Sequence, residues 1–165
     1  MTGSQVIDAE EDRHKLVVEY KDALQPADFY HNFKQRGLRS VQLIPHLEFD
    51  DRGDLTAASV TAELWGKFLI ALFECWVRAD ISRISIELFD ATLQKWCGSE
   101  NPQPRRDCQA CDWHRLCPHA REAMPDSVLC AGYQAFYSYS APHMRVMRDL
   151  IKQHRSPMEL MTMLR

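Results

Sequence analysis

The sequence predicts a helix-rich α/β domain, and three observations lead to this fold class. A helical segment that starts at Pro26 is followed by a glycine and by the apolar, β-branched run SVQLIPHLEF. An amphipathic stretch over residues 60–79 has the strongest helical period in the chain. A cysteine-rich segment without any period separates these elements from a helical C-terminal part. Helices that alternate with short apolar strands are typical of α/β folds.

The first expected element of the fold is a helix that follows a loosely held arm. Residues 1–24 are polar and carry an early acidic run, so we expect a flexible N-terminal arm there. Pro26 suits the first turn of a helix, and the aromatic residues Phe29 and Phe33 share one face of it. Gly37 then ends this helix.

The segment 25–96 is expected to form the α/β part of the chain. Residues 39–45 read as a strand that is buried on both faces. Thr61 or Ser59 can cap the helix that follows, and alternation over residues 83–89 predicts a second short strand before a helical turn or two. The apolar stripe of the helix over residues 60–79 is made by Leu64, Trp65, Phe68, Leu69, Leu72, Phe73 and Trp76.

The segment 97–165 is expected to be a separate module, a cysteine-rich loop followed by helices. The loop needs something other than an apolar core to hold its shape, because prolines and charges replace the periodic apolar residues. The helical part is expected to break at Pro142, and a last short helix is expected to start at Pro157.

Composition restricts the partners and the compartment. The 165 residues carry a formal net charge of −3, so no basic field attracts nucleic acid or an anionic membrane. The chain starts without the apolar region of a signal peptide, and its longest apolar stretch is too short to span a bilayer. We therefore expect no nucleic-acid partner, no membrane association and a cytoplasmic location.

Four cysteines have the spacing of a metal centre. They follow the pattern Cys108-x2-Cys111-x5-Cys117-x12-Cys130. In a reducing compartment such clustering favours metal binding over disulfides, and a tight turn brings the thiolates of a C-x2-C pair to the same side. An iron–sulfur cluster and a structural zinc both fit this spacing.

The other sulfur and imidazole groups leave alternatives open. His114 and His119 lie inside the loop and could replace a cysteine in a zinc site. Free thiols without any metal are the simpler alternative, and Cys75 on the apolar helix is expected to be only a small core residue. For Cys97 the sequence supports two interpretations equally: a metal ligand, or a cysteine that takes no part in the site. A cysteine hydrolase is poorly supported, since nothing marks an oxyanion hole or an orienting third group.

The sequence from Pro26 to the C-terminus resembles the C-terminal part of anaerobic sulfatase-maturating enzymes, radical SAM proteins with a SPASM domain. The matching segments occur in the family's order and spacing. They are VQLIP (41–45), residues 59–90, CQACDWHRLC (108–117) and LCAGYQAFYSYSAPHMRVM (129–147).

The resemblance implies a fold, a cofactor and candidate ligands. It implies that a partial radical-SAM-type (β/α) barrel is followed by a SPASM-like cysteine-rich loop and C-terminal helices. In the family the matching cysteines bind an auxiliary 4Fe-4S cluster, which gives Cys108, Cys111, Cys117 and Cys130 as its ligands here. Leu47 falls where the family approaches S-adenosylmethionine, and the family's substrate is a sulfatase peptide.

The chain also departs from the family pattern. It lacks the C-x3-C-x2-C triad that holds the cluster which cleaves S-adenosylmethionine, so the resemblance implies no radical chemistry by this chain alone, and a bound S-adenosylmethionine is doubtful. The GGC that follows the third ligand in the family is replaced by residues 118–121, PHAR. The second auxiliary cluster of the family therefore has no complete ligand set here.

Two functional hypotheses follow from these observations. The first is a shortened relative of the sulfatase maturases that holds one auxiliary cluster. It would act in electron transfer, or in docking a sulfatase-like peptide or a companion radical SAM chain. An inactive gene remnant is a further form of this hypothesis. The second is a zinc-stapled interaction module whose aromatic helix offers a binding face. A partial barrel would leave strands 39–45 and 83–89 with open edges and the helix 60–79 partly uncovered, which predicts self-association.

Overall fold

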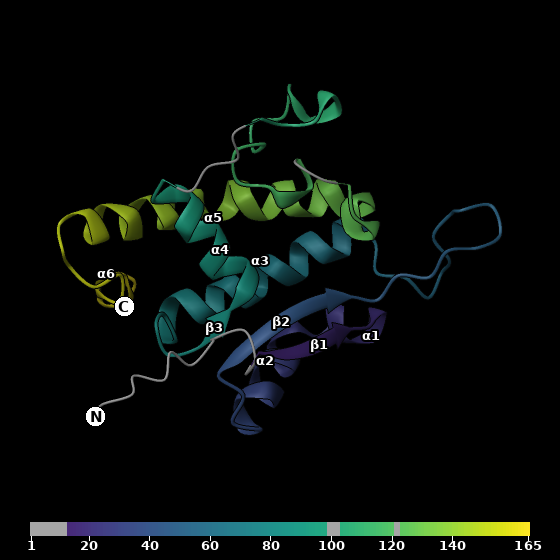
Figure 1. The fold of residues 1–165 in the computed structure, drawn as a ribbon. Helices are drawn as coiled ribbons and strands as arrows, with labels where there is room; N and C mark the ends of the chain where they lie inside the picture. Colours follow the sequence, from purple (N-terminus) through teal and green to yellow (C-terminus); the bar gives the residue numbers. More distant parts are fainter. Residues whose placement is uncertain (1–12, 99–102, 121–122) are drawn as a thin grey trace, which may run out of the picture.

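The computed structural model describes residues 13–98, 103–120 and 123–165, and it confirms a helix-rich α/β fold. Three parallel strands form one sheet in the order β1-β2-β3, and helices pack around it (Figure 1). The elements in chain order are β1 (His14–Val18), α1 (Tyr20–Ala23), α2 (Pro26–Gln35), β2 (Ser40–Pro45), α3 (Ala62–Ala79), β3 (Ser85–Ile86), α4 (Glu87–Trp96), η1 (Arg106–Cys108), η2 (Pro118–Ala120), η3 (Pro125–Leu129), α5 (Cys130–Lys152) and α6 (Glu159–Met163).

The prediction of a flexible arm over residues 1–24 is wrong for the second half of that range. Residues 14–18 form β1 and pair in parallel with β2, with His14 opposite Val41 and Val18 opposite Pro45. Val18 is fully buried, and the short helix α1 follows directly. The expectation for residues 1–12 lies outside the described residues.

The sheet differs from the expected one at β2 and β3. β2 is the middle strand, with β1 paired along one edge and β3 paired only at Ser40 and Val41 on the other, so the predicted open edge of β2 is covered on one side and in part on the other. Within β2 only Val41 is fully buried, and the expected burial on both faces is wrong for the rest of the strand. The strand predicted over residues 83–89 is limited to Ser85–Ile86, because α4 starts at Glu87 and turns Phe89 into the core.

Helix α3 is the central element of the core, as its period predicts. The Thr61 side chain accepts a hydrogen bond from the Leu64 amide at 3.2 Å and so caps the helix. α3 packs most extensively against α5 and also contacts α2 and α6. Its apolar stripe is buried except at Leu64, which is half-buried against the core, so the expectation that this face is partly uncovered is wrong.

Helix α5 runs without a break through Pro142, contrary to the sequence prediction. The proline lies on the exposed side, so it removes one backbone donor while the helix continues. A stripe of buried residues on both sides of it packs against the core and keeps the helix in one piece. Met144 and Met147 belong to this stripe and are fully buried in the core.

The α3–α5 contact is close because two glycines face each other. A Cβ atom on Gly132 would lie 2.4 Å from the carbonyl oxygen of Ala62, and one on Gly66 would lie 3.1 Å from the Gly132 Cα. Trp65 and Tyr133 pack edge to face beside this crossing. The crossing therefore fixes the first turns of α5, against which the cysteine-rich segment lies (Figure 1).

Candidate metal centre

The cysteine-rich loop is a series of tight turns that Arg105 closes at the base. The Arg105 amide donates to the carbonyl oxygen of Ala120 at 2.5 Å, and its Nε donates to the carbonyl oxygen of His119 at 3.0 Å. Within the loop the Cys108 amide donates to the Arg105 carbonyl oxygen at 2.9 Å. The Cys111 amide then donates to the Cys108 carbonyl oxygen at 3.1 Å, so the C-x2-C pair spans one turn.

All four cysteines with metal-centre spacing line one cavity. Cys108, Cys111, Cys117 and Cys130 surround a volume of about 210 Å³ between the loop and the first turns of α5. The side-chain amide of Gln134 lies 3.2 Å from the Cys130 sulfur and 3.7 Å from the Cys111 sulfur. Burial raises the pKa of the Cys130 thiol, and the other three thiols raise it further, because like charges in one cavity repel.

The remaining sulfurs lie elsewhere. Cys97 is exposed at the end of α4 and does not line the cavity. Cys75 lies on α3, packs against the core and has a pKa that burial raises, in agreement with its interpretation as a small core residue. His114 does line the cavity, next to Trp113.

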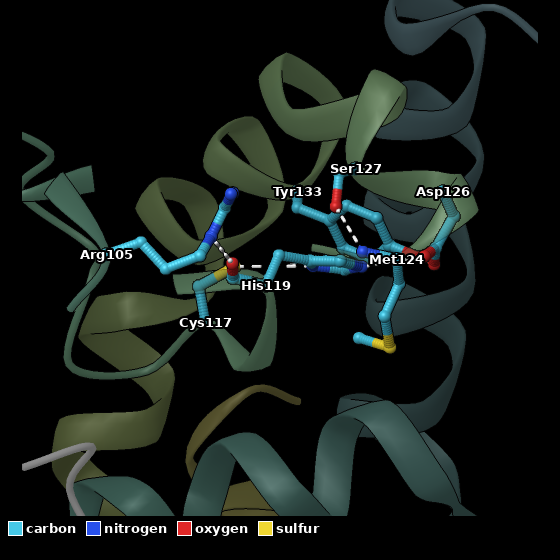
Figure 2. Close-up of polar contacts among 7 residues, drawn as sticks. All are labelled: Arg105, Cys117, His119, Met124, Asp126, Ser127 and Tyr133. Carbon is cyan, nitrogen blue, oxygen red and sulfur yellow. Dashed lines mark hydrogen bonds and ion pairs between the residues drawn. The ribbon is translucent and has the colours of Figure 1, made fainter. Parts of the chain in front are cut away.

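Cys117 belongs to a chain of hydrogen-bonded side chains (Figure 2). Its sulfur lies 3.4 Å from Nδ1 of His119, and Nε2 of the same ring lies 2.8 Å from Oδ1 of Asp126. The Tyr133 hydroxyl donates to the other oxygen of Asp126 at 2.6 Å. The chain thus joins three elements, since His119 lies in η2, Asp126 in η3 and Tyr133 in α5.

Three side chains of this hydrogen-bonded series, Cys117, His119 and Asp126, shift one another's pKa. Burial alone would raise the pKa of Cys117, but the hydrogen bond and charge of His119 outweigh it and bring the pKa below its usual value. Burial lowers the pKa of His119, whereas Asp126 and Cys117 raise it to a net value of about 9. Burial would raise the pKa of Asp126, and the hydrogen bonds from His119 and Tyr133 lower it below its usual range.

Backbone and aromatic groups complete the cavity. The Trp113 amide donates to the Cys111 sulfur at 3.4 Å. The Tyr137 hydroxyl is buried without a nitrogen or oxygen partner among the described residues; burial raises the pKa of this tyrosine, and the nearby Cys117 raises it further. These groups place hydrogen-bond donors around the sulfurs, as is common around metal-bound thiolates.

A second cavity adjoins the cysteine cavity behind a wall of three side chains. It has a volume of about 260 Å³ and lies between β2, α4 and the start of α5. His119, Tyr133 and Tyr137 line both cavities, so a group bound in the second one would lie beside the cysteines. Glu87 and Lys95 contribute charges to its opposite side.

Leu47 lies apart from the cysteines. It lines an open groove at the carboxyl end of β2, together with Pro45, Phe49 and Met124. This groove shares Asp126 with the second cavity and shares no cysteine with the first. The structure thus brings the four expected ligands together and leaves Leu47 at a different place.

Sequence reasoning missed the polar residues that surround the sulfurs. Arg105, Gln134, Asp126 and Tyr133 all contact the loop or the histidine, and none of them stands at a metal-ligand spacing. One usable signal was the GY pair after the fourth cysteine, since the first helical turn of α5 must face the same cavity. No helix among the described residues is long and apolar enough to cross a membrane.

Comparison with known proteins places the chain in a family. No family model matches it. It is 96% identical over its whole length to a protein of Escherichia coli (strain K12) described as uncharacterized protein YidF, and it also covers 100% of that protein. The chain belongs to the YidF family.

The YidF family is in turn related to a class of enzymes over part of the chain. Over 119 residues, 63% of the chain, it is 34% identical to the serine-type anaerobic sulfatase-maturating enzyme of Bacteroides thetaiotaomicron, of which it covers only 27%. The expected resemblance to anaerobic sulfatase-maturating radical SAM enzymes is thereby confirmed.

Solved structures show the same relationship at the level of the fold. The fold matches native anSMEcpe with bound AdoMet and Cp18Cys peptide with a TM-score of 0.63 at 19% identity, over 83% of this chain and 57% of that one. Native anSMEcpe with bound AdoMet matches with a TM-score of 0.63 at 18% identity, over the same 83% and 57%. The YidF-family chain therefore spans a little over half of these structures.

Proposed function

We propose that this chain binds one auxiliary-type 4Fe-4S cluster through Cys108, Cys111, Cys117 and Cys130 and acts as an electron-transfer or peptide-docking module. One observation carries the proposal: in a chain related to sulfatase-maturating enzymes, these four cysteines line a single cavity. The donor set suits the group, because four thiolates are the usual ligands of such a cluster.

The distribution of the thiols favours a cluster over zinc. Four sulfurs about 2.3 Å from one zinc ion would lie only about 3.8 Å from each other. Among the described residues no group of three or more His, Cys, Asp or Glu side chains is close enough to hold a single metal ion. A cubic cluster binds each thiolate at a different iron, so its four ligands surround a volume and not a single point, and the four cysteines line one cavity.

The residues of the cavity have separate roles in this proposal. When bound, the cluster would supply one-electron transfer. The Trp113 amide and the Gln134 side chain donate to the sulfurs, while the rings of Tyr133 and Tyr137 exclude water from the side that faces the second cavity. A peptide side chain in the second cavity would lie against this wall, within reach of electron transfer.

Radical generation by this chain alone is outside the proposal. The sequence has no C-x3-C-x2-C triad, so no described or expected site leaves one iron open to S-adenosylmethionine. Contact of S-adenosylmethionine with Leu47 in the open groove stays a prediction. A companion chain that carries the triad would be needed for maturation chemistry on a sulfatase-like peptide.

Anaerobic purification of the full chain tests the cluster. We expect a brown protein with four irons and four sulfides per chain. Cys111→Ser and Cys130→Ser should each lose most of the iron, whereas Cys97→Ser, an exposed cysteine outside the cavity, should keep all of it. Iron loss in the Cys97 variant equal to that in the cavity variants would contradict the assignment.

The zinc-stapled interaction module is the alternative outcome of the same experiment. A colourless protein with one zinc per chain that the cavity variants lose would overturn the cluster and support a structural staple. In that case the aromatic helix α3 would not serve as the binding face, because the structure buries its apolar residues.

A further inference from the structure

One buried histidine beside the cysteine cavity has partners at both ring nitrogens. His119 is 6% exposed, with Asp126 Oδ1 at 2.8 Å from Nε2 and the Cys117 sulfur at 3.4 Å from Nδ1. It stands in the PHAR segment that directly follows Cys117. Its two partners are a candidate cluster ligand and a carboxylate, so its role needs an explanation of its own.

We propose that His119 is a positioning residue that donates a hydrogen bond from Nδ1 to the Cys117 sulfur and thereby raises the reduction potential of the cluster. The inference rests on the proposed function, because it concerns the same cavity. It adds a residue that controls the electron affinity of the site and that ligand spacing does not identify.

The direction of the hydrogen bond follows from the chemistry of the partners. A carboxylate only accepts, so Nε2 carries the proton that is shared with Asp126. A metal-bound cysteine is a thiolate and has no proton to give, so the proton between Nδ1 and the Cys117 sulfur belongs to the ring. Both nitrogens of His119 then donate, and a positive charge lies between two anions.

The surroundings hold the ring in this orientation. The Tyr133 hydroxyl donates to the second oxygen of Asp126, and the rings of His119 and Tyr133 pack with centroids 4.8 Å apart. The His119 carbonyl oxygen accepts from Arg105, and η3, which carries Asp126, is capped where the Met124 amide donates to Ser127 Oγ at 2.9 Å (Figure 2). A fixed donor of this kind is typical of the groups that orient and tune metal ligands.

The effect on the cluster follows from charge. Reduction adds an electron to an already anionic cluster, so a cationic donor at a ligand sulfur stabilises the reduced form more than the oxidised form. The donors at Cys111 and Cys130, the Trp113 amide and the Gln134 side chain, are neutral. Arg105 is also cationic, but its contact to the Cys108 sulfur is longer, at 3.9 Å.

A potentiometric titration of the cluster-loaded full chain, followed by electron paramagnetic resonance, tests the inference. We expect His119→Ala to lower the midpoint potential, and His119→Gln, which keeps an N–H donor without the charge, to lower it less. His31→Ala, the same substitution at an exposed histidine of α2, should leave it unchanged.

The outcomes separate this inference from the proposed function. If the wild-type chain holds no cluster, both fail. If it holds one, and His119→Gln does not lower the midpoint, only the role of His119 is overturned; this variant also decides the matter if His119→Ala does not retain the cluster. Electron spin-echo spectra of protein labelled with 15N at histidine give a second readout: a weak nitrogen coupling that His119→Gln loses supports the hydrogen bond, and a strong coupling would show direct ligation and overturn it.

Discussion

Gly132→Ala is expected to destabilise the chain, although alanine favours helices over glycine. The added Cβ would lie 2.4 Å from the carbonyl oxygen of Ala62 and 3.0 Å from the amide nitrogen of Gly66. Both atoms belong to the backbone of α3, so neither can move aside as a flexible side chain could. The two helices must separate by roughly 1 Å to restore ordinary contact distances.

The magnitude follows from two opposing terms. Overpacking of a close contact costs about 1–3 kcal/mol, and a rigid backbone oxygen places this case near the upper end. The gain in helix propensity from glycine to alanine is about 1 kcal/mol. The net loss is therefore about 2 kcal/mol, which corresponds to a fall in melting temperature of roughly 4–8 °C for a chain of this size.

Thermal and urea unfolding of the metal-free protein under reducing conditions, followed by circular dichroism, measures this effect. Gly66→Ala is the matched variant on the facing helix: its Cβ would meet contacts of 3.1 to 3.3 Å, so crowding and propensity should nearly cancel. Ser138→Ala, at an exposed position of α5, should show the propensity gain alone. A Gly132→Ala chain as stable as the Ser138→Ala chain would refute the reasoning.

Two further predictions concern one buried and one half-buried carboxylate. Asp80 is 5% exposed and accepts from the Tyr30 hydroxyl at 2.5 Å and from Lys34 at 2.8 Å, so Asp80→Asn should cost about 2 kcal/mol in urea unfolding, while Asp51→Asn on an exposed turn should cost almost nothing. A loss at Asp80 no larger than that at Asp51 would contradict this estimate. Burial raises the pKa of Asp90 despite the opposing Ser85 hydroxyl and Arg13, so its contribution to stability is full below the unfolded-state pKa and is lost as the pH rises through the folded-state pKa. Asp90→Asn should therefore be more stable than wild type at pH 7, and the advantage should vanish in acid; an advantage that is the same at both pH values would refute the assignment.

The parts of the fold that the sequence predicts well are those that local patterns decide. The period of residues 60–79 and the Thr61 cap predict α3, and the structure confirms both. The strand β1 was missed because its three apolar residues, 16–18, form too short a run to show a strand period, and most of the strand lies exposed at the edge of the sheet. Its position depends on parallel pairing with β2, which no local pattern records.

The boundary between the second predicted strand and the next helix was also predicted wrongly because it depends on tertiary packing. The run that starts at Ile84 alternates like a strand, but Ile86, Phe89 and Thr92 also follow a helical spacing, and packing of α4 against β2 and α5 decides in favour of the helix. At the candidate site the C-x2-C turn is local and was predictable. The contact of His119 with Asp126 was not, because it depends on where α5 places η3.

The core and the cysteine-rich loop are stabilised by different kinds of contact. The core has its own closely packed helices, whereas residues 103–118 of the loop fully bury only Leu116, pack Trp113 and Cys117 partly against the core, and are otherwise held by short turns. A segment with so little buried apolar surface opens at a low free energy unless a ligand joins its ends. Cys108, Cys111 and Cys117 lie within that segment and Cys130 begins α5, so a cluster bound to them would tie the loop to the helix that Gly132 and Gly66 hold against α3. Metal binding would thus order the loop beside His119, while the core, which includes Tyr133 and Tyr137, would remain folded without it.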